Sequence, residues 1–226
     1  MLFKHYIIVR FFLRSGFKNK KIAAQKDVDY RIKILNKFFI KSMKRQTCQN
    51  FEVMLLVDEM YKSLDFSAIK SVKNINIIFD NNQRDSLKYM DKKCEYYITT
   101  RIDSDDFVCD DFVELIQSNF LIHKKEMLID FETVNFISSD YSQHSIREYK
   151  YRTMFLSTCF KVADFNSKFC YAKGHGQLHS VFFRKVSIPK KNVFCLVHGR
   201  NIINRIKSGH IVNNKKIINL VKSIYK

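Results

Sequence analysis

The sequence has no tryptophan, a single proline and only five glycines among its 226 residues. So few helix- and strand-breaking residues leave no room for a Pro/Gly-rich linker, which predicts one domain with at most a short appendage. Charges interrupt every apolar run before ~18 residues, so we expect no membrane-spanning helix. The first apolar run contains Lys4, Arg10 and Arg14, and we expect no signal peptide. Six scattered cysteines without zinc spacing predict reduced core thiols in a cytosolic protein.

Acidic residues are scarce in the last third of the chain. Residues 140–226 hold 17 Lys/Arg and three acids, a net charge of +14, whereas residues 1–139 hold 23 and 19, a net charge of +4; the sum is +18. This asymmetry favours a polyanionic partner, which could be nucleic acid, a phosphorylated substrate or an anionic membrane surface. The alternative is compositional, because the chain is rich in Lys, Asn and Ile, as AT-biased coding would give.

The most informative stretch present is Tyr96 to Asp106. It begins with aromatic and β-branched residues typical of a buried strand and ends in Asp103, Asp105 and Asp106. Three carboxylates this close repel one another unless a cation lies among them, and hard oxygen ligands suit Mg²⁺ or Mn²⁺ bridged to phosphates. The alternative is that one acid caps the following helix while the others are solvated. We favour the metal because an apolar strand runs directly into Arg-x-Asp-x-Asp-Asp.

The order of apolar segments predicts the fold class. Expected strands at 5–12, 51–57, 75–79 and 96–102 alternate with expected helices at 28–43, 63–71, 85–94 and 107–123. This alternation predicts an α/β fold with a Rossmann-like, mostly parallel sheet and helices on both faces. Parallel strands all point the same way, so Asp58, Asp80 and Asp103 would lie at one edge of the sheet, where open α/β sheets bind ligands.

The pattern changes after residue 125. Short apolar runs at 127–131 and 134–138 are typical of an antiparallel pair, and 193–197 predicts another strand. From Arg200 onward the pattern is helical, with seven Lys/Arg and no acid. We therefore expect a catalytic domain over 1–199 and a basic amphipathic helical tail over 200–226. The first comprises a nucleotide-binding half, 1–125, and an acceptor half, 126–199.

Four segments together resemble the putative rhamnosyltransferase family. They are Val-Arg-Phe at 9–11, Gln-Thr-Cys-Gln-Asn-Phe-Glu-Val at 46–53, Thr-Thr-Arg-Ile-Asp-Ser-Asp-Asp at 99–106 and Val-His-Gly-Arg-Asn at 197–201. The similarity covers roughly residues 5–205. That family looks like a branch of the inverting glycosyltransferases with the glycosyltransferase A fold. The resemblance implies a nucleotide-sugar donor, a saccharide or lipid-linked acceptor, and a divalent metal, Mn²⁺ or Mg²⁺, held by an Asp-x-Asp motif.

The resemblance also implies roles for individual residues. Asp103 and Asp105 would face the donor ribose and the metal, Asp106 is a further metal candidate, and His198 would complete the metal shell. The donor-binding positions that it implies are Arg10, Asp58, Arg84, Arg101 and Asp103. For His198 the alternative is a strand-end histidine bonded to backbone, and for Arg101 it is a salt bridge to Asp103 or Asp105.

The general base is the main departure from the family pattern. The Glu-Asp motif of inverting relatives is not evident, and the last three acids of the chain are Asp140, Glu148 and Asp164. Asp164 is our first candidate because aromatic residues around it could wall an acceptor pocket; alternatively it is a solvated acid paired with Lys161 or Lys168. His175 and His179, on either side of Gly176, could also serve. The tryptophan that relatives often carry before the late histidine is also missing.

Three functions compete at this point. The leading one is a metal-dependent glycosyltransferase, cytoplasmic or peripheral on the inner face of the membrane, with no nucleic-acid partner. The runner-up is a metal-dependent nucleic-acid enzyme or binding protein, since clustered acids and a basic surface also describe two-metal nucleases. The third is a non-catalytic member that keeps the fold. Rhamnose as the donor sugar is suggested only by the name of the family.

Overall fold

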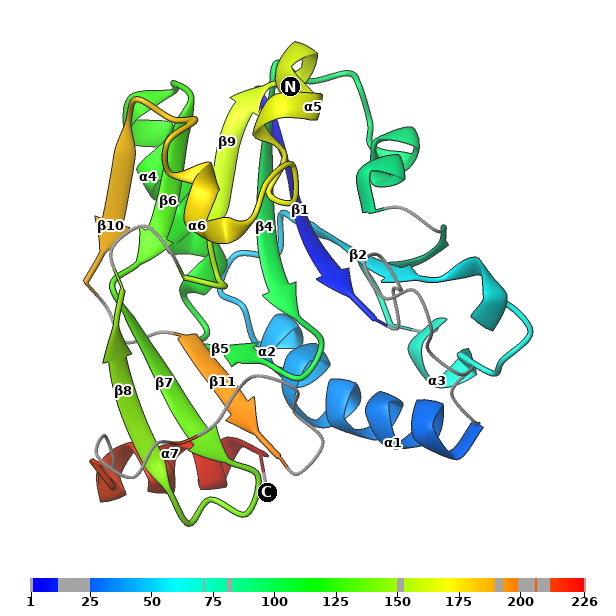
Figure 1. Ribbon diagram of the computed structural model, residues 1–226, viewed down its shortest axis with the longest axis vertical. Coiled ribbons are helices and arrows are strands. Elements are labelled where there is room, and N and C mark those ends of the chain that lie inside the picture. Colours follow the sequence, from blue (N-terminus) through cyan, green and yellow to red (C-terminus); the bar gives the residue numbers. More distant parts are fainter. Residues whose placement is uncertain are drawn as a thin grey trace.

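The fold is seen in a computed structural model that describes residues 2–11, 25–70, 72–80, 83–149, 153–189, 193–198, 206 and 212–225. Two β-sheets organise it (Figure 1). The strands are β1 (Phe3–Arg10), β2 (Glu52–Val57), β3 (Ile75–Phe79), β4 (Tyr96–Asp103), β5 (Phe107–Val108), β6 (Met127–Phe131), β7 (Thr133–Ser138), β8 (His144–Glu148), β9 (Ser157–Lys161), β10 (Lys185–Ile188) and β11 (Val193–Val197).

The larger sheet has seven strands in the order β10-β6-β9-β4-β1-β2-β3. Neighbouring pairs β10/β6, β4/β1, β1/β2 and β2/β3 are parallel, and only β9 runs against its neighbours β4 and β6. The predicted mostly parallel α/β sheet is therefore confirmed. The smaller sheet has the order β5-β11-β7-β8. It packs below the carboxyl ends of the large sheet in the view of Figure 1.

Helices lie on both faces of the large sheet (Figure 1). They are α1 (Gln25–Leu35), the π turn η1 (Asn36–Ile40), α2 (Lys41–Lys44), α3 (Ser67–Lys70), α4 (Phe112–His123), α5 (Phe165–Lys168), α6 (His175–Leu178), α7 (Lys215–Tyr225) and the 3₁₀ turns η2 (Glu59–Tyr61), η3 (Gln83–Tyr89) and η4 (Val162–Asp164). None of the helices in the described ranges is long and apolar enough to cross a membrane.

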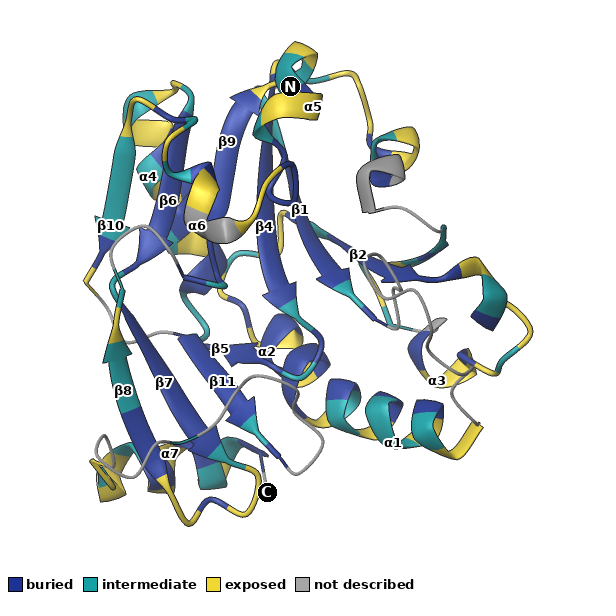
Figure 2. Ribbon diagram, viewed as in Figure 1, coloured by how far each residue is buried: buried dark blue, intermediate teal, exposed yellow. Residues whose placement is uncertain are grey.

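Alternation along the central strands divides the core into two faces. On β1, Ile7 and Val9 point into a cluster covered by α1, α2 and α4, whereas Tyr6 and Ile8 point into a cluster covered by α5 and α6. The central strands are accordingly buried along their length, as Figure 2 shows. A strand buried on both faces is apolar at nearly every position, which is why these runs were recognisable in the sequence.

Two local predictions were wrong. The helix expected from residue 107 begins only at Phe112, because Phe107 and Val108 form β5 against β11. The rings of Phe107 and Phe194 stack with centroids 4.8 Å apart, and this packing outweighs helical periodicity. The runs at 127–131 and 134–138 do not pair with each other: β6 joins the large sheet and β7 joins the small one.

The expected helices at 63–71 and 85–94 are shorter than predicted and partly 3₁₀, namely α3 and η3. Of the basic tail, α7 is helical and packs on the small sheet. Its buried residues Ile218, Val221 and Tyr225 share a cluster with Phe38 of η1 and Phe107 of β5. Strands from both expected halves, 1–125 and 126–199, belong to the larger sheet, in which β9 lies between β4 and β6.

A buried histidine links three strands of the large sheet to α4. His5 on β1 has its Nε2 2.8 Å from the Thr100 hydroxyl and its Nδ1 3.2 Å from the Gln117 amide nitrogen. Thr100 in turn lies 2.7 Å from the Ser157 hydroxyl. A neutral imidazole fits both contacts, because the amide donates to Nδ1 while Nε2–H donates to the hydroxyl. Burial lowers the pKa of His5 from its ordinary 6.5 to about 3.

We expect this histidine to make the fold acid-sensitive. Between pH 6.5 and about pH 3 the unfolded chain protonates His5 and the folded chain does not, so unfolding takes up a proton and stability falls as the pH falls. The slope approaches about 1.4 kcal/mol per pH unit below pH 6. His5→Gln removes this part of the slope in urea unfolding at pH 7.5, 6.5 and 5.5. His123→Gln, a half-buried histidine on α4, should leave the slope unchanged; an equal effect of both variants would contradict the assignment.

Candidate functional site

Four neighbouring strands of the large sheet end in charged residues, or are followed by them, at one edge. Arg10 closes β1, Asp103 closes β4, and the register of the parallel pair places these two residues opposite each other. Asp58 follows β2, and Asp80 follows β3. The prediction that Asp58, Asp80 and Asp103 share one edge is confirmed by the parallel registers of β4, β1, β2 and β3.

An arginine–tyrosine–arginine stack borders Asp103. The Arg10 guanidinium donates to the Asp103 carboxylate at 3.3 Å. The guanidinium carbons of Arg10 and Arg101 lie 5.0 and 4.8 Å from the centroid of the Tyr171 ring. Burial lowers the pKa of Arg10, but Tyr171 and Asp103 raise it by more, so this group stays charged. Burial also raises the pKa of the Tyr171 hydroxyl well above its usual value.

Arg101 is the more enclosed of the two arginines. The residue is 9% exposed, and its Nε is buried with no hydrogen-bond partner among the residues that the structure describes. The expected alternative, a salt bridge to Asp103 or Asp105, is not among the ion pairs of the described residues. Two guanidiniums held by one ring leave positive charge beside Asp103 for an anionic ligand.

The acidic turn after β4 touches the end of β11. The Asp105 carboxylate lies 3.1 Å from Nε2 of His198, whose side chain is only 3% exposed. Tyr30 of α1 packs its ring edgewise against this imidazole, with centroids 6.2 Å apart. Asp105 and His198 are more than ninety positions apart in the sequence but lie in contact. The motifs at 99–106 and 197–201 are thus brought together, as they must be if they act at one site.

Asp106 is turned toward β11 and is fully buried. One carboxylate oxygen accepts the Leu196 backbone N–H at 3.2 Å, and the other accepts the Cys195 thiol at 3.5 Å. Burial raises the pKa of Asp106 well above its usual range, and the charges of Asp105 and Asp103 raise it further. Both oxygens of Asp106 therefore hold the acidic turn against the small sheet.

The donor atoms at this edge suit a hard divalent cation. Asp103 and Asp105 have side chains that are 30% and 23% exposed, and His198 adds an imidazole nitrogen. In the described parts of the chain no group of three or more His, Cys, Asp or Glu side chains is already arranged to hold a metal. Mg²⁺ and Mn²⁺ sites with one or two protein carboxylates take their other ligands from substrate phosphates and water, so the residues present fit a cation that arrives with a diphosphate.

Asp164 lies far from this edge. It follows β9, whose last residue Lys161 pairs with Tyr96 at the start of β4. Asp103 is at the other end of β4. The seven steps from Tyr96 to Asp103 span roughly 23 Å at ~3.3 Å per residue. Asp164 instead pairs with Lys168 at 3.4 Å, which matches the solvated-acid alternative. The structure therefore does not bring Asp164 to the other candidates.

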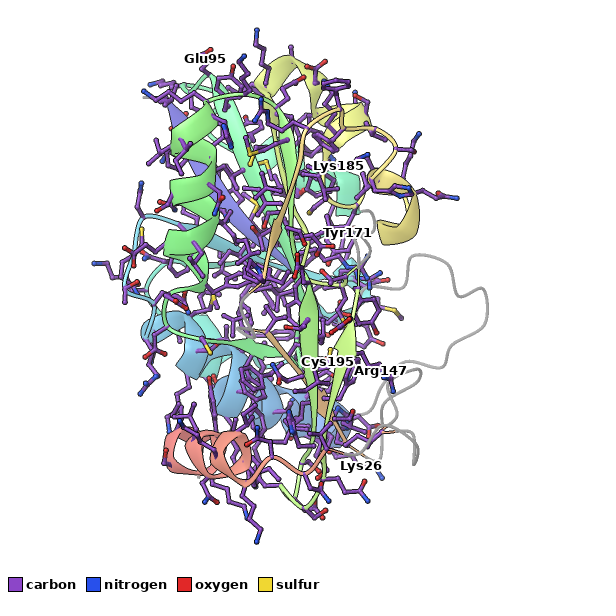
Figure 3. All side chains as sticks on the ribbon, turned by 90° about the vertical axis from the view of Figure 1, so that its left-hand side faces the viewer. Lys26, Glu95, Arg147, Tyr171, Lys185 and Cys195 are labelled. Atoms are coloured by element: carbon purple, nitrogen blue, oxygen red, sulfur yellow. The ribbon has the colours of Figure 1, made fainter. Side chains whose placement is uncertain are left out.

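Figure 3 shows this separation of the two ends. Glu95, next to the start of β4, lies at the far end of the molecule from Cys195 on β11, and Tyr171 lies between them. Antiparallel β9 carries the chain to the Glu95 end before the segment 169–174 returns toward Arg10. Direction of the strand, rather than distance along the sequence, decides which residues reach the site.

The remaining candidates are only partly described. Asp58 is 7% exposed and accepts the Met60 N–H at 3.1 Å as the cap of η2. Arg84 lies in η3 and His175 begins α6, but their side chains fall outside the described residues. Asp140 bonds to Ser142 in the exposed turn after β7, and its neighbour Ser139 donates to the Val197 carbonyl at 2.9 Å.

Sequence reasoning missed three contributors: Tyr30, Tyr171 and the β11 partners of Asp106. No motif marked the tyrosines, because a chain with eleven tyrosines offers many equivalent choices. The contact between Asp106 and Leu196 uses a backbone N–H, which no side-chain pattern reveals. The short spacing from Leu196 on β11 to His198 just after it was the available hint.

Comparison with known proteins gives a family and weak structural likenesses. Residues 16–210 match the family model described as putative rhamnosyl transferase. No curated protein matches the chain. Among solved structures, S. aureus TarS matches with TM-score 0.47 and 12% identity, covering 86% of this chain and 37% of that one. TarS 1–349 matches with TM-score 0.49 and 11% identity, covering 85% and 60%. Its complex with UDP matches with TM-score 0.48 and 11% identity, covering 86% and 60%. The chain thus spans less than two thirds of these proteins.

Proposed function

This chain belongs to the putative rhamnosyl transferase family, and we propose that it is a glycosyltransferase that moves a sugar from a nucleotide-sugar donor to a saccharide or lipid-linked acceptor. The observation that carries the proposal is the meeting of Asp103, Asp105, Arg10 and His198 at the carboxyl edge of the sheet. Acids and guanidiniums side by side suit a ligand with both hydroxyls and a diphosphate. Rhamnose as the sugar is part of the proposal and is supported by the family description alone.

In this proposal, different residues of the chain bind different parts of the donor. Asp58 accepts hydrogen bonds from the nucleoside, Asp103 from the ribose, and the Arg10 and Arg101 guanidiniums face the diphosphate. Asp103, Asp105 and His198 would hold Mn²⁺ or Mg²⁺ when it is bound, and the cation would neutralise charge on the departing phosphate. Tyr171 keeps both arginines in place, so that little reorganisation is needed when the bond to the phosphate breaks.

The acceptor hydroxyl needs a base, and His175 is the candidate that fits the fold. It begins α6, whose Leu178 packs in the same cluster as Tyr171 on the face that carries Arg101. Asp164 is at the opposite end of β9 and is not part of the proposal. A base in this position takes the hydroxyl proton as the new glycosidic bond forms, an effect typically worth ~10²–10⁴ in rate.

A thermal-shift panel tests this proposal. UDP, dTDP, GDP and CDP are each added with and without Mn²⁺ to the wild type, to Asp105→Asn and to the control Asp140→Asn. A nucleotide at ~100 times its Kd adds about 2.7 kcal/mol of stability, so we expect a metal-dependent rise in Tm with one nucleotide, retained in the control and lost in Asp105→Asn. Salt-sensitive oligonucleotide binding without any nucleotide response would instead favour a nucleic-acid protein.

A further inference from the structure

Four lysines form one exposed stripe along the continuous helical segment α1–η1–α2. Lys33, Lys37, Lys41 and Lys44 are all exposed and follow one another at intervals of four, four and three residues. Residues three and four apart share one side of a helix, and the wider turn of η1 keeps Lys37 and Lys41 nearly in line. The stripe therefore presents four positive charges in one direction.

The helix α7 extends this positive surface. The Lys41 ammonium lies 6.0 Å from the centroid of the Tyr225 ring, and Figures 1 and 3 show α7 beside the lower helices of the fold. No acidic residue occurs in α7, and its basic residues are Lys215, Lys216 and Lys222. The two helical segments thus adjoin at Lys41 and Tyr225, and the surface that carries their seven lysines is called here the lysine face.

An apolar cavity opens beside the lysine face. It has a volume of about 310 Å³ and lies between α7, the end of α2 and the segment 107–111. Most of its wall is apolar, made by residues such as Phe107, Phe194 and Ile224. Leu220 lines it as well and is 51% exposed. A half-exposed leucine in the wall of an apolar cavity, on a helix that also carries three lysines, combines an apolar and a cationic surface.

We propose that the lysine face docks on an anionic phospholipid bilayer, with an apolar lipid chain entering the cavity at Leu220. Lysines near such a surface each contribute to binding, and apolar side chains add to it by leaving water. A nucleic acid would use the lysines but would leave the cavity and Leu220 unexplained. In an anionic bilayer the headgroups would interact with the lysines, and the acyl chains would contact the apolar wall of the cavity.

Nearby acids do not cancel the positive charge. Asp110 at the cavity is held by Arg45 through bonds of 3.0 and 2.7 Å. Glu114 accepts the Thr47 hydroxyl at 2.6 Å, and Asp111 is the other acid in the cavity wall. Against these three acids stand Arg45 and the seven lysines of the stripe and α7, so the surface keeps a positive balance.

Docking in this way would bring the candidate site near the bilayer. Tyr30, which packs against His198, lies one helical turn before Lys33 on α1. The edge with Asp105 would then face the level at which a lipid-linked saccharide presents its sugar. This last step rests on the proposed function, whereas the docking itself does not.

Vesicle co-flotation tests the proposal. Vesicles of phosphatidylcholine alone, or with about 30% phosphatidylglycerol, are mixed with the full chain at low and high salt. We expect binding only to the anionic vesicles, and weaker binding at high salt. The triple variant Lys33→Gln, Lys37→Gln and Lys44→Gln should lower the partition coefficient about a hundredfold. Leu220→Asn should lower it severalfold without any change in charge.

A matched triple variant controls for net charge. Lys92→Gln, Lys93→Gln and Lys125→Gln remove three exposed lysines near the opposite end of β4 and should bind like the wild type. Each variant is first shown to melt at the wild-type temperature. No flotation of the wild type, or an equal loss in both triple variants, would overturn the proposal. Displacement from vesicles by oligonucleotides at equal phosphate concentration would also overturn it. None of these readouts needs a sugar donor, so failure here is separate from failure in the nucleotide panel.

Discussion

Asp105→Asn is expected to lower kcat for sugar transfer by about 10²–10³-fold while changing KM for the donor by much less. The carboxylate lies 3.1 Å from His198 and is 23% exposed at the edge where the diphosphate would bind. Negative charge grows on the phosphate as it departs, so a group that helps to neutralise that charge acts more strongly in the transition state than in the ground state. Asparagine keeps the size of the side chain and an acceptor for His198, which isolates the effect of the charge.

The measurement is the steady-state release of nucleoside diphosphate over a range of donor concentrations. His198→Gln should have a smaller effect, about tenfold, because a glutamine amide can still donate to Asp105. Asp140→Asn, in the turn after β7, is the control and should match the wild type. A rise in KM with kcat unchanged would mean that Asp105 contributes only uniform binding, and the role given to it here would be wrong.

The carboxylate edge could be read from the sequence because each strand that builds it is a nearly continuous apolar run ended by a charged residue. Once β1, β2, β3 and β4 are taken as parallel, Asp58, Asp80 and Asp103 must lie at one edge of the sheet, and the registers show that they do. Nothing about side-chain packing is needed for this step. The contact of His198 with Asp105 was anticipated only through the family resemblance.

Strand direction was the information that the sequence did not contain. The run 157–161, Ser-Thr-Cys-Phe-Lys, predicts neither a parallel nor an antiparallel neighbour, yet its antiparallel pairing sends Asp164 to the opposite end of β4 from Asp103. The same pairing lets the segment after α5 return across the sheet and place Tyr171 between Arg10 and Arg101. An aromatic residue in a mixed aromatic and basic stretch gives no sign of such a position.

Three adjacent carboxylates could not be told apart by sequence either. Which of Asp103, Asp105 and Asp106 is exposed depends on the turn that follows β4 and on β11, about ninety residues away. The structure separates them: Asp103 meets Arg10, Asp105 meets His198, and Asp106 is buried against backbone. The predicted metal role for Asp106 has no such support, since both of its oxygens contact β11.

Asp106→Ala is accordingly expected to destabilise the fold by about 2–4 kcal/mol, whereas Asp106→Asn should stay within about 1 kcal/mol of the wild type. Alanine removes the carboxylate that accepts from the buried Leu196 N–H and from the Cys195 thiol, which keeps its 2.8 Å contact with the Met154 sulfur, and it opens a cavity between the acidic turn and β11. Asparagine still accepts from Leu196. Asparagine also cannot carry the negative charge that burial and the charges of Asp105 and Asp103 disfavour. These are the causes that raise the pKa of Asp106.

Urea unfolding at pH 7 in the presence of a chelator measures both variants without any contribution from bound metal. Cys195→Ala removes only the weaker donor and serves as the matched control, with an expected cost of about 1 kcal/mol. Because His198 follows Leu196 by two residues on the end of β11, the alanine variant should also lose the metal-dependent nucleotide response, and the asparagine variant should keep it. Equal destabilisation by alanine and asparagine would show instead that the charge of Asp106, rather than its hydrogen bonds, holds the turn in place.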